Sequence, residues 1–320
     1  MITAERISKT FDRGKKAVDS VSFEVAEGET LILLGTSGCG KTTTLRMINR
    51  LIEPSEGNIY VNGTNIRDLR PEELRRGMGY VLQDSGLFPH YTVAENVAVV
   101  PGLLGWEKNR IRKRTSELLE KLHLSPSEYM DVYPGTLSGG QQQRVGLARA
   151  LAADQPVLLM DEPFGALDPV TRAHVRKDFR TLDEIHRKTV IMVTHDVSEA
   201  LELGNRICLM HEGKVAQWGT PAELLLKPAS EFVRSFFEES RLELELRVVR
   251  VSEAWDLLPA ADDSAAEPES AANLWEILQK TNTQPGGQVR LHWEGHTRSV
   301  SGADVMTAFH RYKDKLAKNA

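Results

Sequence analysis

The feature that most constrains this chain is a short glycine-rich run that ends in a lysine and a hydroxyl residue. It reads Gly35-Thr36-Ser37-Gly38-Cys39-Gly40-Lys41-Thr42 and is followed by Thr43. The run fits the pattern G-x-x-x-x-G-K-[ST], with an apolar segment at 30–34 before it and apolar residues at helical spacing in 41–51 after it. A strand, a glycine turn and a helix in this order predict a loop whose backbone N–H groups surround a phosphate. Lys41 is expected to reach the β- and γ-phosphates, and Thr42 to ligate Mg²⁺.

The rest of the N-terminal two thirds predicts an α/β fold. Short apolar segments at 2–7 and 18–25 indicate N-terminal strands joined by turns, and further strands are predicted at 79–82, 157–160 and 190–193. Helical stretches between them are typical of a mostly parallel sheet covered by helices. Residues 84–153 lie between two predicted strands and look largely helical, so we expect them to form a helical subdomain.

Polar residues follow three of these predicted strands. Asp161 and Glu162 come after 157–160, Gln83 follows 79–82, and His195 follows the strand at 190–193. Adjacent acids after a strand more often belong to a solvated turn or a helix cap. The catalytic interpretation of this pair therefore rests on the presence of the phosphate loop. Because ligands of open α/β sheets bind outside the carboxyl ends of the strands, these groups are expected to converge. Asp161 is then predicted to hold Mg²⁺ through water, and Glu162 to orient or deprotonate the attacking water.

A second glycine motif decides the family. Leu137-Ser138-Gly139-Gly140-Gln141-Gln142-Gln143-Arg144 precedes a helical run through Leu151, and Ala166-Leu167-Asp168 follows the acidic pair. With the phosphate loop, these motifs resemble the ABC-type ATPases over residues 1–238. Ser138, Gly139 and Gly140 would form a second anion site at a helix N-terminus, too distant within the helical insertion to serve the same nucleotide. A second subunit is therefore implied.

The resemblance assigns further roles. It implies that two chains pair head to tail around two ATP molecules, each presenting its Ser138 loop, with Gln141, to the γ-phosphate held by the other's Lys41. It also implies that Phe11 stacks on the adenine, that Gln83 links Mg²⁺ to the helical insertion, that His195 contacts the γ-phosphate and that Asp168 helps the dimer contact. Phe11 could instead be an ordinary core residue, and Cys39 a filler in a loop that binds through its backbone. Since each motif is intact, both sites of a homodimer should hydrolyse ATP; a heterodimer with a similar ATPase is the alternative.

Within the family, Gln83 to His90 and the stretch 100–106 (VPGLLGW) resemble the subgroup that imports osmoprotectants such as glycine betaine, choline, carnitine or proline betaine. That resemblance implies integral membrane permease subunits as partners and, indirectly, an external substrate-binding protein. Importers of polar amino acids or polyamines share most of the other features. A soluble, non-transport ABC ATPase usually carries two ATPase units or a long coiled-coil insertion, and a nucleotide-binding regulator would not need an intact Glu162 and His195.

Composition limits the location and the partners. A net charge of −5 offers no basic footprint for nucleic acid, and no apolar run approaches the ~20 residues that span a bilayer. We expect a peripheral protein at the cytoplasmic face of the membrane. Residues 239–320 are predicted to form a small α+β accessory module with an acidic linker at about 259–273. Residues 274–279 and 300–304 faintly resemble one degenerate half of a CBS pair, which suggests a regulatory role.

Overall fold

The computed structural model describes residues 2–11, 14–165, 167–259, 273–284, 286–294 and 296–318. The chain divides into two compact units, Met1–Thr220 and Pro221–Ala320. The division falls earlier than the boundary expected after residue 238, because α10 (Pro221–Leu226) packs against α12 (Arg241–Val248) rather than closing the first unit.

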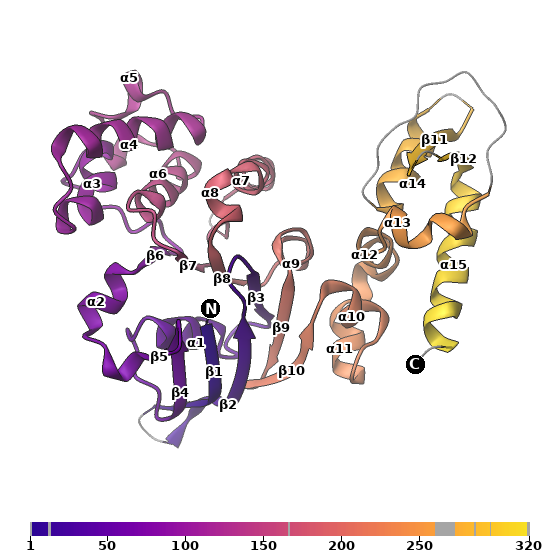
Figure 1. Ribbon diagram of the computed structural model, residues 1–320, viewed down its shortest axis with the longest axis horizontal. Helices are drawn as coiled ribbons and strands as arrows, with labels where there is room; N and C mark the ends of the chain where they lie inside the picture. Colours follow the sequence, from indigo (N-terminus) through magenta and orange to yellow (C-terminus); the bar gives the residue numbers. More distant parts are fainter. Residues whose placement is uncertain are drawn as a thin grey trace. The chain divides into compact units, whose positions relative to one another are not determined.

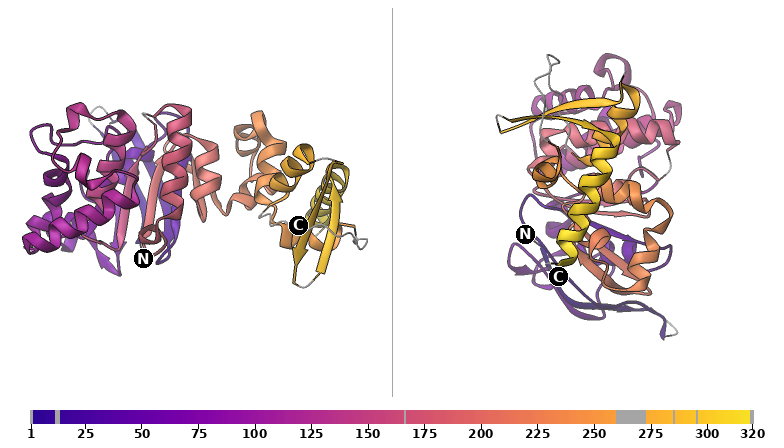
Figure 2. Two further views of the ribbon diagram at one scale, coloured as in Figure 1. Left: turned by 90° about the horizontal axis from the view of Figure 1, so that it is seen from above. Right: turned by 90° about the vertical axis from the view of Figure 1, so that its right-hand side faces the viewer.

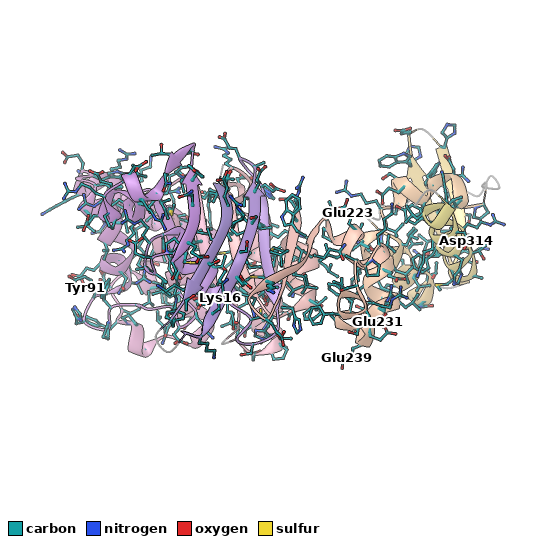
Figure 3. All side chains as sticks on the ribbon, turned by 90° about the horizontal axis from the view of Figure 1, so that it is seen from below. Lys16, Tyr91, Glu223, Glu231, Glu239 and Asp314 are labelled. Carbon is teal, nitrogen blue, oxygen red and sulfur yellow. The ribbon has the colours of Figure 1, made fainter. Side chains whose placement is uncertain are left out.

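A four-stranded antiparallel sheet contains the N-terminus, with strand order β2-β1-β4-β5. Its strands are β1 (Ile2–Thr10), β2 (Lys16–Val25), β4 (Glu56–Val61) and β5 (Thr64–Asn65). Figure 3 shows its longer strands side by side, with Lys16 labelled on β2. Apolar side chains such as Ile7, Val21 and Ile59 are buried, and many of the residues between the apolar ones are exposed or half-buried. The predicted N-terminal strands are therefore present, and β4 and β5 join them.

The central sheet has six strands in the order β10-β9-β3-β8-β7-β6. They are β3 (Thr30–Gly35), β6 (Met78–Val81), β7 (Val157–Asp161), β8 (Thr189–Thr194), β9 (Arg206–His211) and β10 (Lys214–Gly219). All neighbours pair in parallel except β10, which is antiparallel to β9. Every residue of β7 and β8 is buried, as expected for strands covered on both faces. This confirms the mostly parallel α/β core.

Helices extend from this sheet. They are α1 (Lys41–Ile48), α2 (Pro71–Arg76), α7 (Pro169–Thr181), α8 (Asp183–His186) and α9 (Val197–Leu203), with a 3-10 turn at Ile66–Asp68. A helical subdomain lies between β6 and β7 and contains α3 (Val93–Leu103), α4 (Lys108–Lys121), α5 (Pro126–Tyr129) and α6 (Gly139–Leu151), with a 3-10 turn at Pro134–Thr136. Figure 1 shows these helices gathered together at one end of the unit, where α3 and α4 pack on α6. The insertion expected at 84–153 is thus helical: all of its regular elements are α-helices or a 3-10 turn.

The second unit is a small α+β module with its own apolar core. It contains α10, α11 (Glu231–Phe236), α12, α13 (Val251–Ala254), α14 (Leu274–Thr283), β11 (Gln288–Trp293), β12 (His296–Ser301) and α15 (Gly302–Lys318), with 3-10 turns at Glu238–Ser240 and Trp255–Leu257. Leu246, Trp255, Ile277 and Phe309 lie in the core. Figure 2 shows the β11–β12 hairpin beside α15. Most of the acidic linker predicted at 259–273 lies outside the described residues.

Candidate functional site

A cavity of about 820 Å³ lies at the carboxyl ends of the central strands. It brings together predicted residues from the whole first unit. Those lining it are Phe11, Ser37, Gly38, Gly40, Lys41, Thr42, Thr43, Gln83, Glu162 and His195. The lining does not include Gly35, Thr36, Cys39 or Asp161, nor the helical motif at Ser138. Groups separated by more than a hundred residues therefore meet at one opening.

The phosphate loop has a backbone that only glycine accommodates at two positions. Gly35 has φ +148, and a Cβ there would lie 2.3 Å from the carbonyl oxygen of Met210. Gly40 has φ +102, and a Cβ there would lie 2.5 Å from the carbonyl oxygen of Ala17. Gly40 is also the N-cap of α1 and supplies no side-chain cap. The first N–H groups of α1 are therefore left for an anion, and the helix dipole favours negative charge there.

Lys41 bridges the two ends of its own loop. Its Nζ donates to the carbonyl oxygens of Gly35 and Thr36, both at 2.8 Å, and lies 3.9 Å from the Sγ of Cys39. The residue is buried, although it borders the cavity. An ammonium group has three donors, so these contacts hold the lysine close to the place where the loop would receive a phosphate.

Thr42 and Asp161 form an oxygen-rich pair beside the lysine. The Thr42 hydroxyl donates to Asp161 Oδ1 at 2.8 Å, and Asp161 is 1% exposed at the end of β7. In the part of the chain that the structure describes, no group of three His, Cys, Asp or Glu side chains could hold a metal. Hydroxyl, carboxylate and amide oxygens nevertheless suit Mg²⁺, which usually keeps several waters and shares substrate phosphates. The donor set of Thr42, Asp161 and Gln83 therefore fits that ion.

Glu162 is the meeting point of two other predicted residues. Its Oε2 lies 3.4 Å from Gln83 Nε2 and 3.3 Å from His195 Nδ1. The Glu162 backbone has φ +45, a left-handed conformation that is uncommon for a residue with a side chain, and its N–H donates to the Val193 carbonyl. Strain of this kind is concentrated at functional sites. The turn aims a carboxylate into the cavity between an amide and an imidazole.

The second glycine motif begins α6. Ser138 is its N-cap: its hydroxyl accepts from the Gln141 N–H at 3.3 Å, and Gln141 Oε1 accepts from the Ser138 N–H at 2.8 Å. Gln141 Nε2 also donates to the Tyr129 hydroxyl. The Gln141 side chain is thus engaged within its own helical subdomain, a local role that the sequence analysis did not include.

The two glycines of this motif have different surroundings. A Cβ at Gly139 would meet nothing within 4 Å, whereas one at Gly140 would lie 2.6 Å from Thr171 Cγ2. Gly140 therefore permits α6 and α7 to approach closely, and Gly139 leaves the N-terminus of α6 open.

Asp168 caps α7. Its carboxylate accepts from the N–H groups of Val170 and Thr171, both at 3.1 Å, and hydrogen bonds from Thr171 hold the pKa of Asp168 below its usual value. The dimer contact expected for Asp168 stays a prediction. Ala166 of the same motif lies outside the described residues.

Phe11 stands at the cavity rather than in the core. It is 42% exposed, and the Lys9 ammonium lies 5.3 Å from its ring centroid. Sequence reasoning missed other lining residues, which are Lys15, Lys16, Ala17, Glu212 and Gly213. The Lys15-Lys16 pair after a glycine was a usable signal for an anion site, whereas the β9–β10 turn at Glu212 carried none.

Comparison with known proteins identifies the family to which the chain belongs. The ABC transporter family model matches residues 18–165. A choline transport ATP-binding protein of Bacillus subtilis strain 168 is 52% identical over 242 residues, which are 76% of this chain and 63% of that protein. A glycine betaine uptake system ATP-binding protein of Escherichia coli strain K12 is 50% identical over 250 residues, or 78% of this chain and 80% of that protein. The chain belongs to the ABC transporter family. Its central sheet and helical insertion are those of an ABC ATPase cassette.

A solved structure agrees with this assignment. The dimeric post-hydrolysis state of an ATP-binding cassette bound to ADP and Pi is 35% identical and has a TM-score of 0.62, covering 69% of this chain and 98% of the cassette. The match thus concerns the cassette. This ABC chain also spans only about 63% of the length of the Bacillus protein. No described helix is long and apolar enough to cross a bilayer.

Proposed function

We propose that this chain is the ATP-hydrolysing subunit of an importer for quaternary-amine osmoprotectants, and that it works as a dimer around two ATP molecules at the cytoplasmic face of the membrane. One observation carries the hydrolytic part of the proposal. A single cavity joins the phosphate loop, the Thr42–Asp161 pair and a Glu162 carboxylate between Gln83 and His195.

The residues act by binding and by moving one proton. The loop N–H groups and Lys41 hold the triphosphate, while Phe11 offers a face for the base. Thr42, Asp161 and Gln83 would hold Mg²⁺, which would neutralise charge developing on the transferred phosphoryl group. Glu162 orients water and accepts its proton, and His195 donates a hydrogen bond toward the γ-phosphate.

Replacing Glu162 by Gln tests this mechanism. The amide keeps the shape and the hydrogen bonds but cannot accept the proton, so turnover should fall by about 10²- to 10⁴-fold while ATP-dependent dimers accumulate. Phosphate release and size-exclusion chromatography measure the two effects. The exposed Glu72 on α2 provides a control, since Glu72→Gln should leave both properties at parental values. Unchanged turnover in the Glu162 variant would remove that residue from its role.

Support for a membrane partner comes from an exposed apolar patch on the helical subdomain. We call this set the apolar patch; it comprises Phe88, Tyr91, Leu103 and Leu104, of which Leu103 is 60% exposed. Figure 3 labels Tyr91 on the loop that follows Gln83. Phe88 and Tyr91 precede α3 and Leu103 and Leu104 lie at its other end, and exposed apolar groups on one subdomain commonly mark an interaction site. We assign the apolar patch to the permease subunits.

The solute assignment rests on the relatives, whose names state choline and glycine betaine transport. The decisive test is uptake into vesicles that contain this chain with its permease and binding protein. ATP-dependent uptake of labelled glycine betaine or choline, lost in the Glu162→Gln variant, is expected. Uptake of a polar amino acid or polyamine in place of these solutes would favour the alternative importer class.

A further inference from the structure

Asp161 is a buried carboxylate with two partners from one helix. Thr42 donates to its Oδ1 at 2.8 Å, and the Arg46 guanidinium contacts its Oδ2 at 3.4 Å. Thr42 and Arg46 are four residues apart on α1, so both side chains project from the same helix face. The helix therefore clamps each oxygen of the carboxylate separately, one with a neutral group and one with a cation.

The carboxylate needs that cation because it has almost no access to water. Asp161 is 1% exposed, and a buried charge without a partner is strongly disfavoured. Among the described residues, Arg46 is the cationic side chain within ion-pair distance of Asp161. The hydroxyl of the neighbouring Tyr80 is buried beside the same two side chains, Arg46 and Asp161. Burial, and next the charge of Asp161, raise the pKa of Tyr80 to about 12, so this phenol stays neutral.

The ion pair can also open. The Arg46 side chain is 44% exposed, and its 3.4 Å separation from Asp161 is longer than a strong charge-assisted hydrogen bond of about 2.7–2.9 Å. The half-exposed Arg46 guanidinium loses little interaction free energy when it moves into water, whereas the buried Asp161 carboxylate stays in place. A denser positive charge arriving at Asp161 would therefore displace Arg46 rather than Asp161.

We propose that Arg46 is the resident counter-ion of Asp161, holding the carboxylate in place until Mg²⁺ arrives with the nucleotide and then yielding it to the metal. The proposal rests on the nucleotide site described above. It makes Arg46 a positioning residue that competes with Mg²⁺. Removing Arg46 should therefore destabilise the metal-free protein and tighten Mg²⁺ binding.

Thermal unfolding of the full chain separates this role from a structural one. Three conditions are compared: no ligand, ADP with EDTA, and ADP with Mg²⁺. Arg46→Met should unfold about 2–4 °C below the parent in the first two conditions and within roughly 1 °C of it in the third. Arg46→Lys keeps the charge and should recover most of the loss.

Arg50 supplies the matched control. It lies just beyond the same helix, donates to Glu53 and to the carbonyl oxygens of Ile66 and Leu69, and does not contact Asp161. Arg50→Met should lose the same stability in all three conditions. A titration of Mg²⁺ at fixed ADP adds a second readout, in which Arg46→Met should require about 2- to 5-fold less Mg²⁺ for half-saturation.

Two outcomes overturn the proposal. An equal loss of stability in all three conditions makes Arg46 merely structural, and a higher Mg²⁺ requirement in Arg46→Met makes it a helper rather than a competitor. If Mg²⁺ with ADP fails to stabilise the parent, the nucleotide site itself is wrong. If Mg²⁺ with ADP raises the unfolding temperature of the parent and of Arg46→Met by the same amount, the nucleotide site stands and only the counter-ion role of Arg46 is rejected.

Discussion

At the scale of single residues, Cys39 is the position in the phosphate loop where alkylation of a thiol would disturb the loop. It is buried in the phosphate loop, and its Sγ would lie 2.9 Å from a Cβ placed on Gly35. An added alkyl group therefore has no room unless the loop opens. The only other thiol, Cys208, is fully buried, and burial raises its pKa to about 12, so it contributes little reactive thiolate at neutral pH.

We therefore expect N-ethylmaleimide to alkylate Cys39 slowly and thereby to inactivate ATP hydrolysis. Bound ATP should protect Cys39 from the reagent. Displacing the loop should lower phosphate release on the order of 10²-fold, because small misplacements of a phosphoryl group are costly. Mass spectrometry of the labelled peptide and the rate of hydrolysis measure this. Cys39→Ser is the control and should hydrolyse ATP while resisting the reagent. Full activity of protein alkylated at Cys39 would contradict the expectation.

The site residues differ in how far the sequence could predict them. The positions of Lys41, Thr42 and Asp161 beside one another could be predicted, because they follow from local patterns, a glycine turn before a helix and acids after a strand. That of Arg46 could not, since its contact with Asp161 depends on how α1 packs beside β7. Glu212 and Gly213 reach the cavity through a turn between strands that the sequence analysis did not place.

At the scale of elements, α6 is tied to the loop that follows Gln83. Arg149, near the end of α6, donates from its two terminal nitrogens to the carbonyl oxygens of Ser85 and Gly86, both at 2.7 Å. Its guanidinium also lies 5.8 Å from the Phe88 ring, and burial lowers the pKa of Arg149. The helix that begins at the Ser138 motif is therefore linked to the loop that carries part of the apolar patch.

Replacing Arg149 by Met should uncouple these elements. In vesicles containing the complete transporter, we expect solute taken up per ATP hydrolysed to fall by about 2- to 30-fold, with hydrolysis falling less. Arg114→Met is the control, since Arg114 contacts the Leu151 carbonyl at the end of α6 but not this loop. Equal losses of uptake and hydrolysis in the Arg149 variant would show a loss of folding or catalysis rather than of coupling.

Element prediction succeeded where apolar runs were bounded by glycines or motifs. The strands at 30–34, 79–82, 157–160 and 190–193 all have counterparts in β3, β6, β7 and β8. The strands β4, β9 and β10 were not placed, because their edges are marked only by ordinary turns and β4 and β10 are largely half-buried. Which sheet a strand joins depends on long-range pairing, and β3 leaves its N-terminal neighbours to pair with β8 and β9.

At the scale of the whole molecule, one chain carries two separate helix N-termini for which anion binding is predicted. The Ser138 motif opens α6 toward solvent and does not line the cavity of its own phosphate loop. The helix start at Ser138 was predictable because the motif precedes a helical run, whereas the division at Thr220 was not, since α10 carries no boundary signal. A regulatory role for the second unit stays a hypothesis.

Mixing two inactive variants tests whether the halves of a site come from two chains. Lys41→Ala removes the phosphate lysine, and Gly139→Asp adds a negative charge at an open position without a clash at Cβ. Each alone should be inactive, but a heterodimer keeps one intact site, so an equimolar mixture should regain roughly a quarter of parental hydrolysis per chain. A mixture of Lys41→Ala with Glu162→Gln is the control. Lys41 and Glu162 belong to the same half of a site, so each chain of this heterodimer carries one damaged copy of that half and no complete site remains. Heterodimers that co-purify yet show no recovery would mean that each chain encloses its nucleotide alone, which is incompatible with a motor that closes on ATP.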